Sequence, residues 1–230
     1  MGATQIMVIR HGEKPDSYGG TQYYGVDPTG QVCGAAAGEH LVTFGWQRAG
    51  GLVTLFAPPH GGQAPLGTPA TLFATDPGTP NDTSSSDPSQ RPYETILPLA
   101  AALGTPGTPM AIDTSYEKKD IKEVVAAALA CSGVVLICWQ HEDIPLVGKD
   151  KPKGISQQIL DQTDTPADQF WIPSTWPTDA QGNARYDLVF VFDRPSGTGA
   201  VTGFSLVGQY LLAGDAAPPQ PPAGWAPGDG

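Results

Sequence analysis

Cationic side chains are scarce in this chain of 230 residues, which has 12 Lys and Arg residues against 23 Asp and Glu. The formal net charge of -11 repels polyanions at long range, so we expect no nucleic-acid partner. Long apolar runs are also missing, since no stretch reaches the roughly 18 apolar residues that a membrane-spanning helix needs. The first residues lack the basic segment and long apolar core of a secretion signal. We therefore expect a cytoplasmic protein with no membrane partner.

Cysteine is rare as well, because the chain has only three and none of them forms a CxxC pair. An odd number without paired spacing indicates neither a complete disulfide framework nor a cysteine zinc site. The adjacent His141, Glu142 and Asp143 do not favour a metal site either, because neighbouring residues cannot easily face one ion. The sequence predicts no metal and no cofactor.

Glycine and proline are abundant instead, with 29 and 24 residues. Their combined fraction of the chain lies just below the level typical of a disordered protein. However, 40% of the residues are hydrophobic, which is enough for the core of one domain. We predict a single domain at residues 1–213 with long loops at 13–38 and 75–90. The Pro/Gly-rich tail at 214–230 is either an extended strap or disordered.

Apolar runs alternate with helical spacings along the chain. Strands are predicted at residues 5–9, 71–74, 110–113, 133–139, 187–192 and 202–212. Helices are predicted at residues 39–56, 91–103, 120–131 and 155–161. We expect Pro98 to set the start of the second helix or to bend it. The alternation predicts an α/β fold with helices on both faces of a sheet and ligands at the carboxyl ends of its strands.

Histidine and arginine occur at the ends of predicted strands. The chain has only four histidines and five arginines, yet Arg10 and His11 directly follow the first strand and His141 follows the strand at 133–139. Arg91 lies at the start of a helix, where the helix dipole disfavours a cation. An Arg-His-Gly triplet alone is a weak signal, because three-residue matches are frequent by chance. Its position after a buried strand strengthens a functional interpretation.

Further segments extend this pattern in a fixed order. They are RHGEKP at 10–15, LVTFGWQRAGGL at 41–52, TLFATDP at 71–77, SQRPYETILPLAAALG at 89–104 and VVLICWQHEDIPLV at 134–147. Together these segments resemble the histidine phosphatase superfamily, also called the phosphoglycerate mutase-like superfamily. They are similar to its signature, its first helix, its second strand with the following helix, and its later core strand with the second histidine.

The resemblance implies a three-layer α/β/α sandwich with a mostly parallel central sheet. It also implies a metal-independent phosphatase in which His11 attacks phosphorus to form a phosphohistidine, while Arg10, Arg91 and His141 bind the phosphate. A neutral imidazole is a competent nucleophile near pH 7, and covalent transfer divides a difficult displacement into two easier steps. The expected substrate is a phosphorylated small molecule or a phosphoprotein.

Two glutamates are candidates for the proton donor to the leaving group. Glu142, directly after His141, resembles the donor of the acid-phosphatase branch, and we favour it. Glu117 is the alternative, because in the mutase-like branch the donor is a glutamate after the third strand. The nearby Lys118 and Lys119 are interpreted as solvated surface charges.

Two other functions remain open on this pattern. A phosphomutase of the same superfamily would return the phosphoryl group to a second position of its substrate. A catalytically silent member would bind a phosphorylated ligand without turnover, although the complete set of two arginines and two histidines argues against it.

Overall fold

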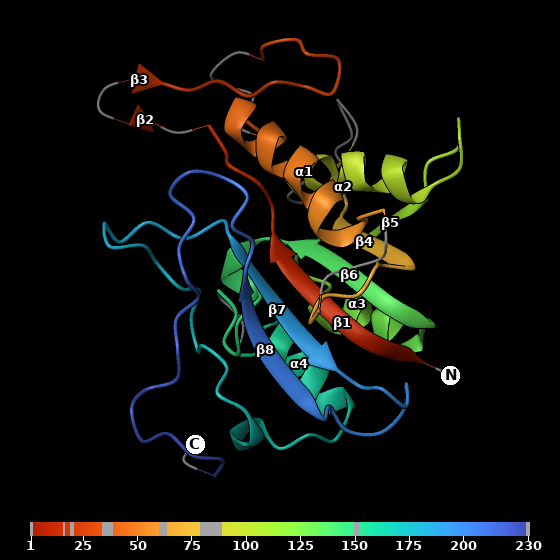
Figure 1. The fold of residues 1–230 in the computed structure, drawn as a ribbon, viewed down its shortest axis with the longest axis vertical. Coiled ribbons are helices and arrows are strands. Elements are labelled where there is room, and N and C mark those ends of the chain that lie inside the picture. Colours follow the sequence, from red (N-terminus) through yellow and green to blue (C-terminus); the bar gives the residue numbers. More distant parts are fainter. Residues whose placement is uncertain are drawn as a thin grey trace.

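The computed structural model describes residues 2–15, 17–18, 21–33, 39–59, 64–78, 89–149 and 152–228. In these ranges the strands are β1 (Ala3–Arg10), β2 (Ser17–Tyr18), β3 (Thr21–Gln22), β4 (Thr71–Thr75), β5 (Ile112–Tyr116), β6 (Gly133–Trp139), β7 (Leu188–Asp193) and β8 (Gly203–Gly208). The α-helices are α1 (Thr43–Phe56), α2 (Gln90–Leu103), α3 (Ile121–Ala130) and α4 (Ile155–Gln162), and short 3-10 helices cover His141–Asp143 (η1) and Ala167–Gln169 (η2). Figure 1 shows their arrangement.

Six of these strands form one mixed sheet in the order β5-β4-β6-β1-β7-β8. The pairings among β5, β4, β6 and β1 are parallel, whereas β7 runs antiparallel to both β1 and β8. The predicted α/β class is confirmed. The carboxyl ends of the four parallel strands therefore meet at one edge of the sheet, together with the amino end of β7.

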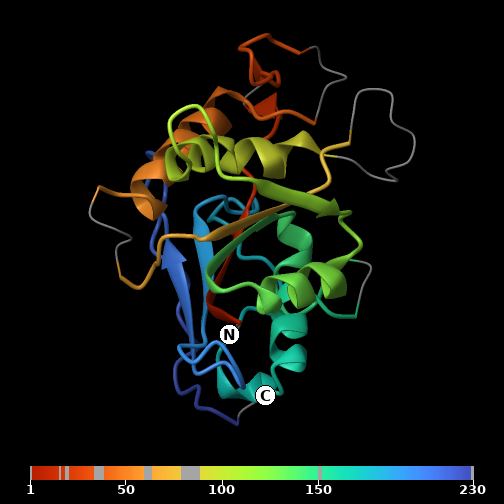
Figure 2. The same cartoon turned by 90° about the vertical axis from the view of Figure 1, so that its right-hand side faces the viewer.

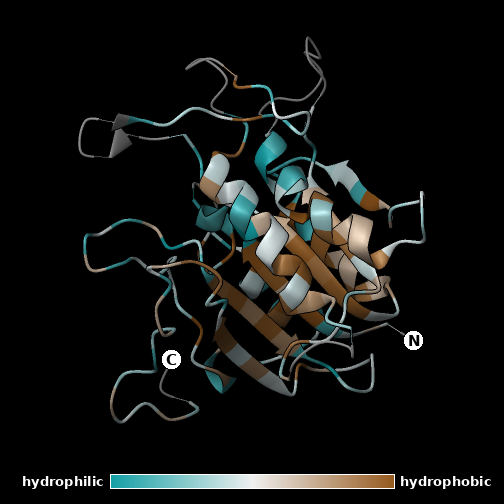
Figure 3. Ribbon diagram, turned by 45° about the horizontal axis from the view of Figure 1, so that its top comes forward, coloured by the Kyte–Doolittle hydropathy of each residue, from teal (hydrophilic) through white to brown (hydrophobic). Residues whose placement is uncertain are grey.

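Apolar side chains cover both faces of the sheet, because successive residues of a strand point to opposite sides. In β6, Val135 and Ile137 belong to a buried cluster with α3 and α4, while Leu136 and Cys138 belong to a second cluster with α1 and α2. Figure 2 shows the two helix pairs on opposite sides of the sheet, and Figure 3 shows that its strands are mostly hydrophobic. Burial on both faces explains why β6 reads as a continuous apolar run.

Several predicted boundaries needed correction. Helix α1 begins at Thr43 rather than at residue 39, because the Leu41 N–H donates to the buried Glu94 carboxylate and its carbonyl accepts from Val26. Strand β5 begins and ends later than the predicted 110–113. Pro98 lies inside α2 and does not mark its start, because the helix begins at Gln90.

The tail after β8 is held to the domain by hydrogen bonds. Asp215 accepts two of them from the buried Arg48 of α1, at 2.8 and 3.1 Å. Arg185 donates to the carbonyls of Ala216 and Ala217 at 2.7 and 2.9 Å. The first residues of the tail thus form a strap between α1 and the segment before β7. No helix in the described part of the chain is long and apolar enough to cross a membrane.

Candidate active site

The pairing of β1 with β6 brings the two sequence-predicted histidines to one edge of the sheet. Arg10 lies opposite Trp139 in the parallel register, and the His11 N–H continues the ladder by donating to the Trp139 carbonyl at 3.1 Å. His141 follows two residues after Trp139, at the start of η1. The local cause is simple, since two neighbouring parallel strands end in polar residues at the same level of the sheet.

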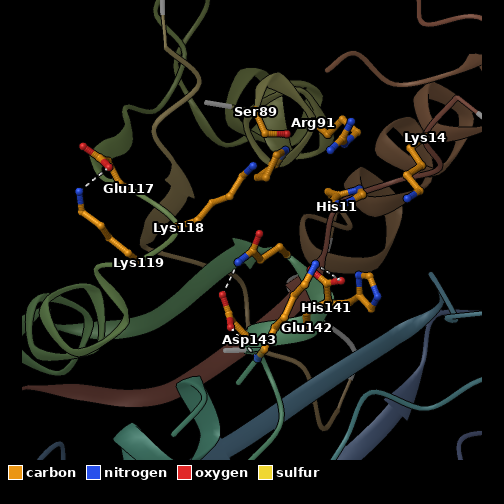
Figure 4. A pocket seen from close by; sticks show the side chains of 13 residues that line it. His11, Lys14, Ser89, Arg91, Glu117, Lys118, Lys119, His141, Glu142 and Asp143 are labelled. Atoms are coloured by element: carbon orange, nitrogen blue, oxygen red, sulfur yellow. Dashed lines mark hydrogen bonds and ion pairs between the residues drawn. The ribbon is translucent and has the colours of Figure 1, made fainter. Parts of the chain in front are cut away.

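A pocket of about 430 Å³ opens at this edge, and we call it the strand-end pocket (Figure 4). Its described lining residues are His11, Lys14, Ser89, Arg91, Pro92, Glu117, Lys118, Lys119, Gln140, His141, Glu142, Asp143 and Lys149. They come from the ends of β1, β5 and β6 and from the first turn of α2. Five of the predicted site residues therefore line one pocket, although they are spread over more than 130 residues of sequence.

One nitrogen of the buried His11 ring is fixed by the backbone. Its side chain is almost fully covered, and Nδ1 lies 2.7 Å from the Gly12 carbonyl oxygen. A carbonyl can only accept a hydrogen bond, so Nδ1 carries the proton in the neutral ring. The lone pair is then on Nε2. This tautomer is the one required of a histidine that attacks through Nε2.

A threonine that sequence reasoning missed connects this turn to Arg91. The Gly12 N–H donates to Thr95 Oγ1 at 2.7 Å, and Thr95 Oγ1 donates to the Arg91 carbonyl at 2.7 Å. Thr95 is fully buried, so this connection is shielded from water. It fixes the first turn of α2, which carries Arg91, relative to the nucleophile candidate. A threonine four residues after Arg91 in an otherwise apolar helix face was the available signal.

Gly12 is needed for packing against α1. A Cβ on Gly12 would lie 3.0 Å from the Gly45 carbonyl oxygen, and a Cβ on Gly45 would lie 2.6 Å from the Glu13 carbonyl oxygen. The two glycines therefore allow the backbone after β1 to approach the helix closely. This contact holds the turn that contains His11 against α1.

Both histidines are neutral near pH 7. Burial lowers the pKa of His11 well below its usual value, and the charges of Arg10 and Arg91 lower it further. Burial, followed by the charges of Arg10 and Lys14, lowers the pKa of His141 to about 3. A neutral His11 keeps its nucleophilic lone pair. A neutral His141 can still donate one hydrogen bond to an anion.

Arg10 is buried beside the strand-end pocket and is not among its lining residues. Its guanidinium donates to the carbonyls of Ala184 and Arg185, and its central carbon lies 3.6 Å from the centre of the Tyr186 ring. Its charge nevertheless lowers the pKa of both histidines, so it acts electrostatically on the site. The guanidinium of Arg91, by contrast, belongs to the pocket lining, and its Nη2 lies 3.8 Å from Glu39.

The two candidate proton donors lie in different parts of the strand-end pocket. Figure 4 shows Glu142 beside His141 and on the same side as His11, whereas Glu117 lies across the pocket beside Lys119. Each carboxylate has a lysine partner: Glu142 is 3.0 Å from Lys149, and Glu117 is 2.9 Å from Lys119. Of the two candidates, Glu142 thus lies on the same side of the pocket as the two histidines.

Four of the described lysines line the strand-end pocket, and the sequence did not predict this role for any of them. Lys118 and Lys119 line the strand-end pocket, although the side chain of Lys119 is 62% exposed. Lys14 and Lys149 line it as well, and both lower the pKa of His141. For Lys118 and Lys119, the sequence feature that could have predicted this role is their position just after β5, at the same edge of the sheet as His11. Within the part of the chain that the structure describes, no three His, Cys, Asp or Glu side chains are grouped to hold a metal ion.

No model of a known protein family matches the chain, and the comparison with curated proteins found no matching sequence. The residues of the strand-end pocket, and the resemblance of the sequence segments that form it, are what indicate a function for the protein.

Proposed function

We propose that the protein is a metal-independent phosphatase that hydrolyses a phosphomonoester through a phosphohistidine on His11. The observation that carries this proposal is the hydrogen bond from His11 Nδ1 to the Gly12 carbonyl, which leaves Nε2 as the nucleophilic atom at a pocket that also contains Arg91 and His141. The resemblance to the histidine phosphatase superfamily assigns the same roles to these residues. The helices on both faces of the sheet support the superfamily's three-layer α/β/α architecture as the finer description of the fold.

The charge of the strand-end pocket supports an anionic substrate. Its described lining has five cationic side chains and three carboxylates, whereas the whole chain carries a net charge of -11. Attraction of phosphate is therefore local, because screening limits the reach of fields between separate charges to about 8 Å at physiological salt. A pocket with a cationic excess in an acidic protein selects a compact anion over a polyanion.

In the first step, His11 Nε2 forms a bond to phosphorus while the bond from phosphorus to the leaving oxygen breaks. Arg91 and His141 donate hydrogen bonds to the phosphoryl oxygens, where charge is redistributed during transfer. When Lys149 turns from Glu142 to the bound phosphate, the Glu142 carboxylate takes up the proton of the substrate monoanion and passes it to the leaving oxygen, so the alcohol departs neutral. The phosphoryl group is now on His11.

In the second step, water replaces the alcohol. The Glu142 carboxylate takes a proton from the water as its oxygen attacks phosphorus, and the bond from phosphorus to Nε2 breaks. Inorganic phosphate takes this proton from Glu142 and leaves, and both side chains return to their starting forms. Lys149 leaves Glu142 during this cycle, because a bound phosphate dianion offers the Lys149 ammonium group a competing ion pair.

The proposal is tested with His11→Asn, and His40→Gln is the matched control. His40 is partly buried and bonded to Glu94 but does not line the strand-end pocket. We expect His11→Asn to lose turnover of acetyl phosphate and phenyl phosphate by about 10³-fold or more, since removal of a covalent nucleophile leaves only binding and electrostatic catalysis. His40→Gln should remain active if it stays folded by circular dichroism.

Undiminished turnover in His11→Asn would remove the nucleophile assignment. A wild-type protein that binds phosphate in calorimetry but turns over neither ester would instead be a silent phospho-ligand-binding protein. Turnover that requires a bisphosphate primer would indicate a phosphomutase.

A further inference from the structure

A second pocket adjoins the strand-end pocket on the side of Glu142. It has a volume of about 330 Å³ and shares His141, Glu142 and Lys149 with the strand-end pocket. Its other described lining residues are Val147, Gly148, Thr175, Trp176, Thr178, Gly182 and Ala184. These residues come from the segment after η1 and from the segment that leads to β7. We call this second pocket the side pocket.

The chemistry of the side pocket differs sharply from that of its neighbour. None of the seven residues that it does not share is charged, whereas the strand-end pocket has cations on several sides. Val147 is 50% exposed and offers an apolar side chain that the fold leaves largely uncovered. Among the described residues, the charged lining of the side pocket is confined to Glu142 and Lys149, which it shares with the strand-end pocket. A charged group placed against the other residues would lose hydration without a compensating partner. The side pocket therefore fits an uncharged group.

Trp176 gives the side pocket a rigid wall. Its Nε1–H donates to the Arg185 carbonyl at 2.8 Å, and its ring stacks on Phe190 with centres 5.4 Å apart. The ring of His141 meets Trp176 edge-on, with centres 6.2 Å apart. Because the indole is only 7% exposed and is held from three sides, it is a fixed part of the pocket wall that is in place before a ligand arrives.

The position of Glu142 gives the side pocket a role in the reaction. A general acid must reach the leaving oxygen, which lies between the phosphorus atom and the rest of the alcohol. Glu142 lies at the boundary of the two pockets, since it lines both. When the phosphoryl group is at His11 in the strand-end pocket, an alcohol whose oxygen meets Glu142 extends into the side pocket.

We propose that the side pocket binds the leaving alcohol and that the substrates are phosphomonoesters of uncharged, ring-sized alcohols, with aryl phosphates as the best probes. This inference rests on the proposed phosphatase function and on Glu142 as its acid. It deepens that function by naming the class of leaving group.

A third hollow is the main competitor for the leaving group. It has a volume of about 430 Å³, is lined by Tyr23, Val42, Phe44 and Leu212 among others, and shares only Lys14 with the strand-end pocket. Neither Glu142 nor Glu117 lines it. An alcohol in this hollow would thus have its oxygen next to neither candidate acid.

The test compares Val147→Asp with Phe44→Asp. The two side chains are matched in exposure, at 50% and 52%, so both substitutions place a carboxylate on a half-exposed apolar wall. The probes are phenyl phosphate, whose ring reaches the side pocket, and acetyl phosphate, whose leaving group is too short to reach Val147. The value of kcat/KM is measured because it reports the phosphorylation step, whereas hydrolysis of the phosphohistidine is common to all substrates.

We expect Val147→Asp to lower the ratio of kcat/KM for phenyl phosphate over acetyl phosphate by about tenfold, the size of a typical change in pocket contacts. Phe44→Asp should leave the ratio unchanged. In the wild type, phenyl phosphate should be turned over with a higher kcat/KM than 4-carboxyphenyl phosphate, which carries a carboxylate on the ring carbon opposite the leaving oxygen.

The inference is overturned if Val147→Asp leaves the ratio unchanged or if Phe44→Asp lowers it instead. A wild-type preference for 4-carboxyphenyl phosphate would also overturn it, because the leaving group would then lie in a cationic environment and not in an uncharged one. These results are distinct from a failure of the proposed function, in which His11→Asn would still turn over both phenyl phosphate and acetyl phosphate.

Discussion

Strands β1, β4, β5 and β6 run parallel, and the ends of β1, β5 and β6 line the strand-end pocket. Strand β7 runs the other way, and the residues that precede Leu188 contact Arg10 and do not line this pocket. The parallel part supplies His11, His141, Glu142 and, through the helix after β4, Arg91. The antiparallel part supplies the carbonyls and the aromatic ring that hold Arg10, together with the Trp176 wall. The comparison teaches that, in the proposed reaction, the residues around the phosphoryl group come from the parallel half, whereas the supports of Arg10 and the Trp176 wall come from the other half.

The strap formed by the first residues of the tail also belongs to the supports of Arg10. Arg185 is bonded to Asp187 and to the carbonyls of Ala216 and Ala217, while its own carbonyl accepts from Arg10. Contacts therefore run continuously from the tail to the arginine next to His11. Variants of the parallel half should change activity strongly, and variants of the antiparallel half should change it moderately.

The largest difference between the two halves is expected for Arg91→Ala. Loss of one preorganised donor to the phosphoryl oxygens should reduce kcat/KM for phenyl phosphate by about 10²–10³-fold. The thermal midpoint should change little, because Arg91 lines the pocket and belongs to neither of the two apolar clusters. Steady-state kinetics and thermal unfolding followed by circular dichroism measure the two quantities. Loss of activity that only parallels loss of folded protein would speak against a direct role.

The pH dependence of the free energy of unfolding tests whether the parallel half holds His141 neutral. The pKa of His141 is about 3 in the folded protein and near 6.5 in the unfolded chain, so between these values only the unfolded chain binds the proton. The free energy of unfolding should therefore fall as the pH is lowered from 6.5 towards 3. In His141→Gln this fall should be shallower by up to about 1.4 kcal/mol per pH unit, and by less than this because the ring is partly exposed.

Urea unfolding at several pH values between 4 and 7 measures this slope. Equal slopes for the wild type and His141→Gln would mean that His141 titrates normally and that the site does not hold it neutral. His11 has its pKa lowered in the same direction, so part of the slope should persist in the variant.

A smaller loss of kcat/KM is expected for a substitution in the antiparallel half. Tyr186→Leu removes the ring against which the Arg10 guanidinium packs but leaves the carbonyl partners of Arg10. A cation–π contact contributes about 1 kcal/mol, which corresponds to roughly a fivefold loss of kcat/KM. Tyr186→Phe keeps the ring and should restore the activity of the wild type. A loss as large as that of Arg91→Ala would contradict the division of roles between the halves.

The sequence predicted the positions of β6 and β7 to within one residue, but not the contacts made by the segment before β7. Strand β6 was predicted with its observed bounds, because burial on both faces makes its sequence continuously apolar. His11 and His141 could be placed at one edge because parallel strands share the position of their carboxyl ends.

The contacts of Tyr186 and Trp176 depend on the direction and register of β7, which no short pattern in the sequence encodes. The orientation of Arg10 towards the carbonyls of residues 184 and 185 depends on the same pairing. The late start of α1 depends on the buried Glu94, which is distant in sequence. These contacts and this helix start thus depend on residues distant in sequence, and a local sequence pattern could not predict them.

The central claim is that a phosphoryl group is carried by His11. It is tested by mixing the protein with a phenyl phosphate labelled in its phosphoryl group, quenching in alkaline denaturant and locating the label by mass spectrometry. We predict a label on His11 that survives alkali, is lost in acid and is absent from His11→Asn. Turnover without a labelled protein, or a label on another residue, would contradict the account.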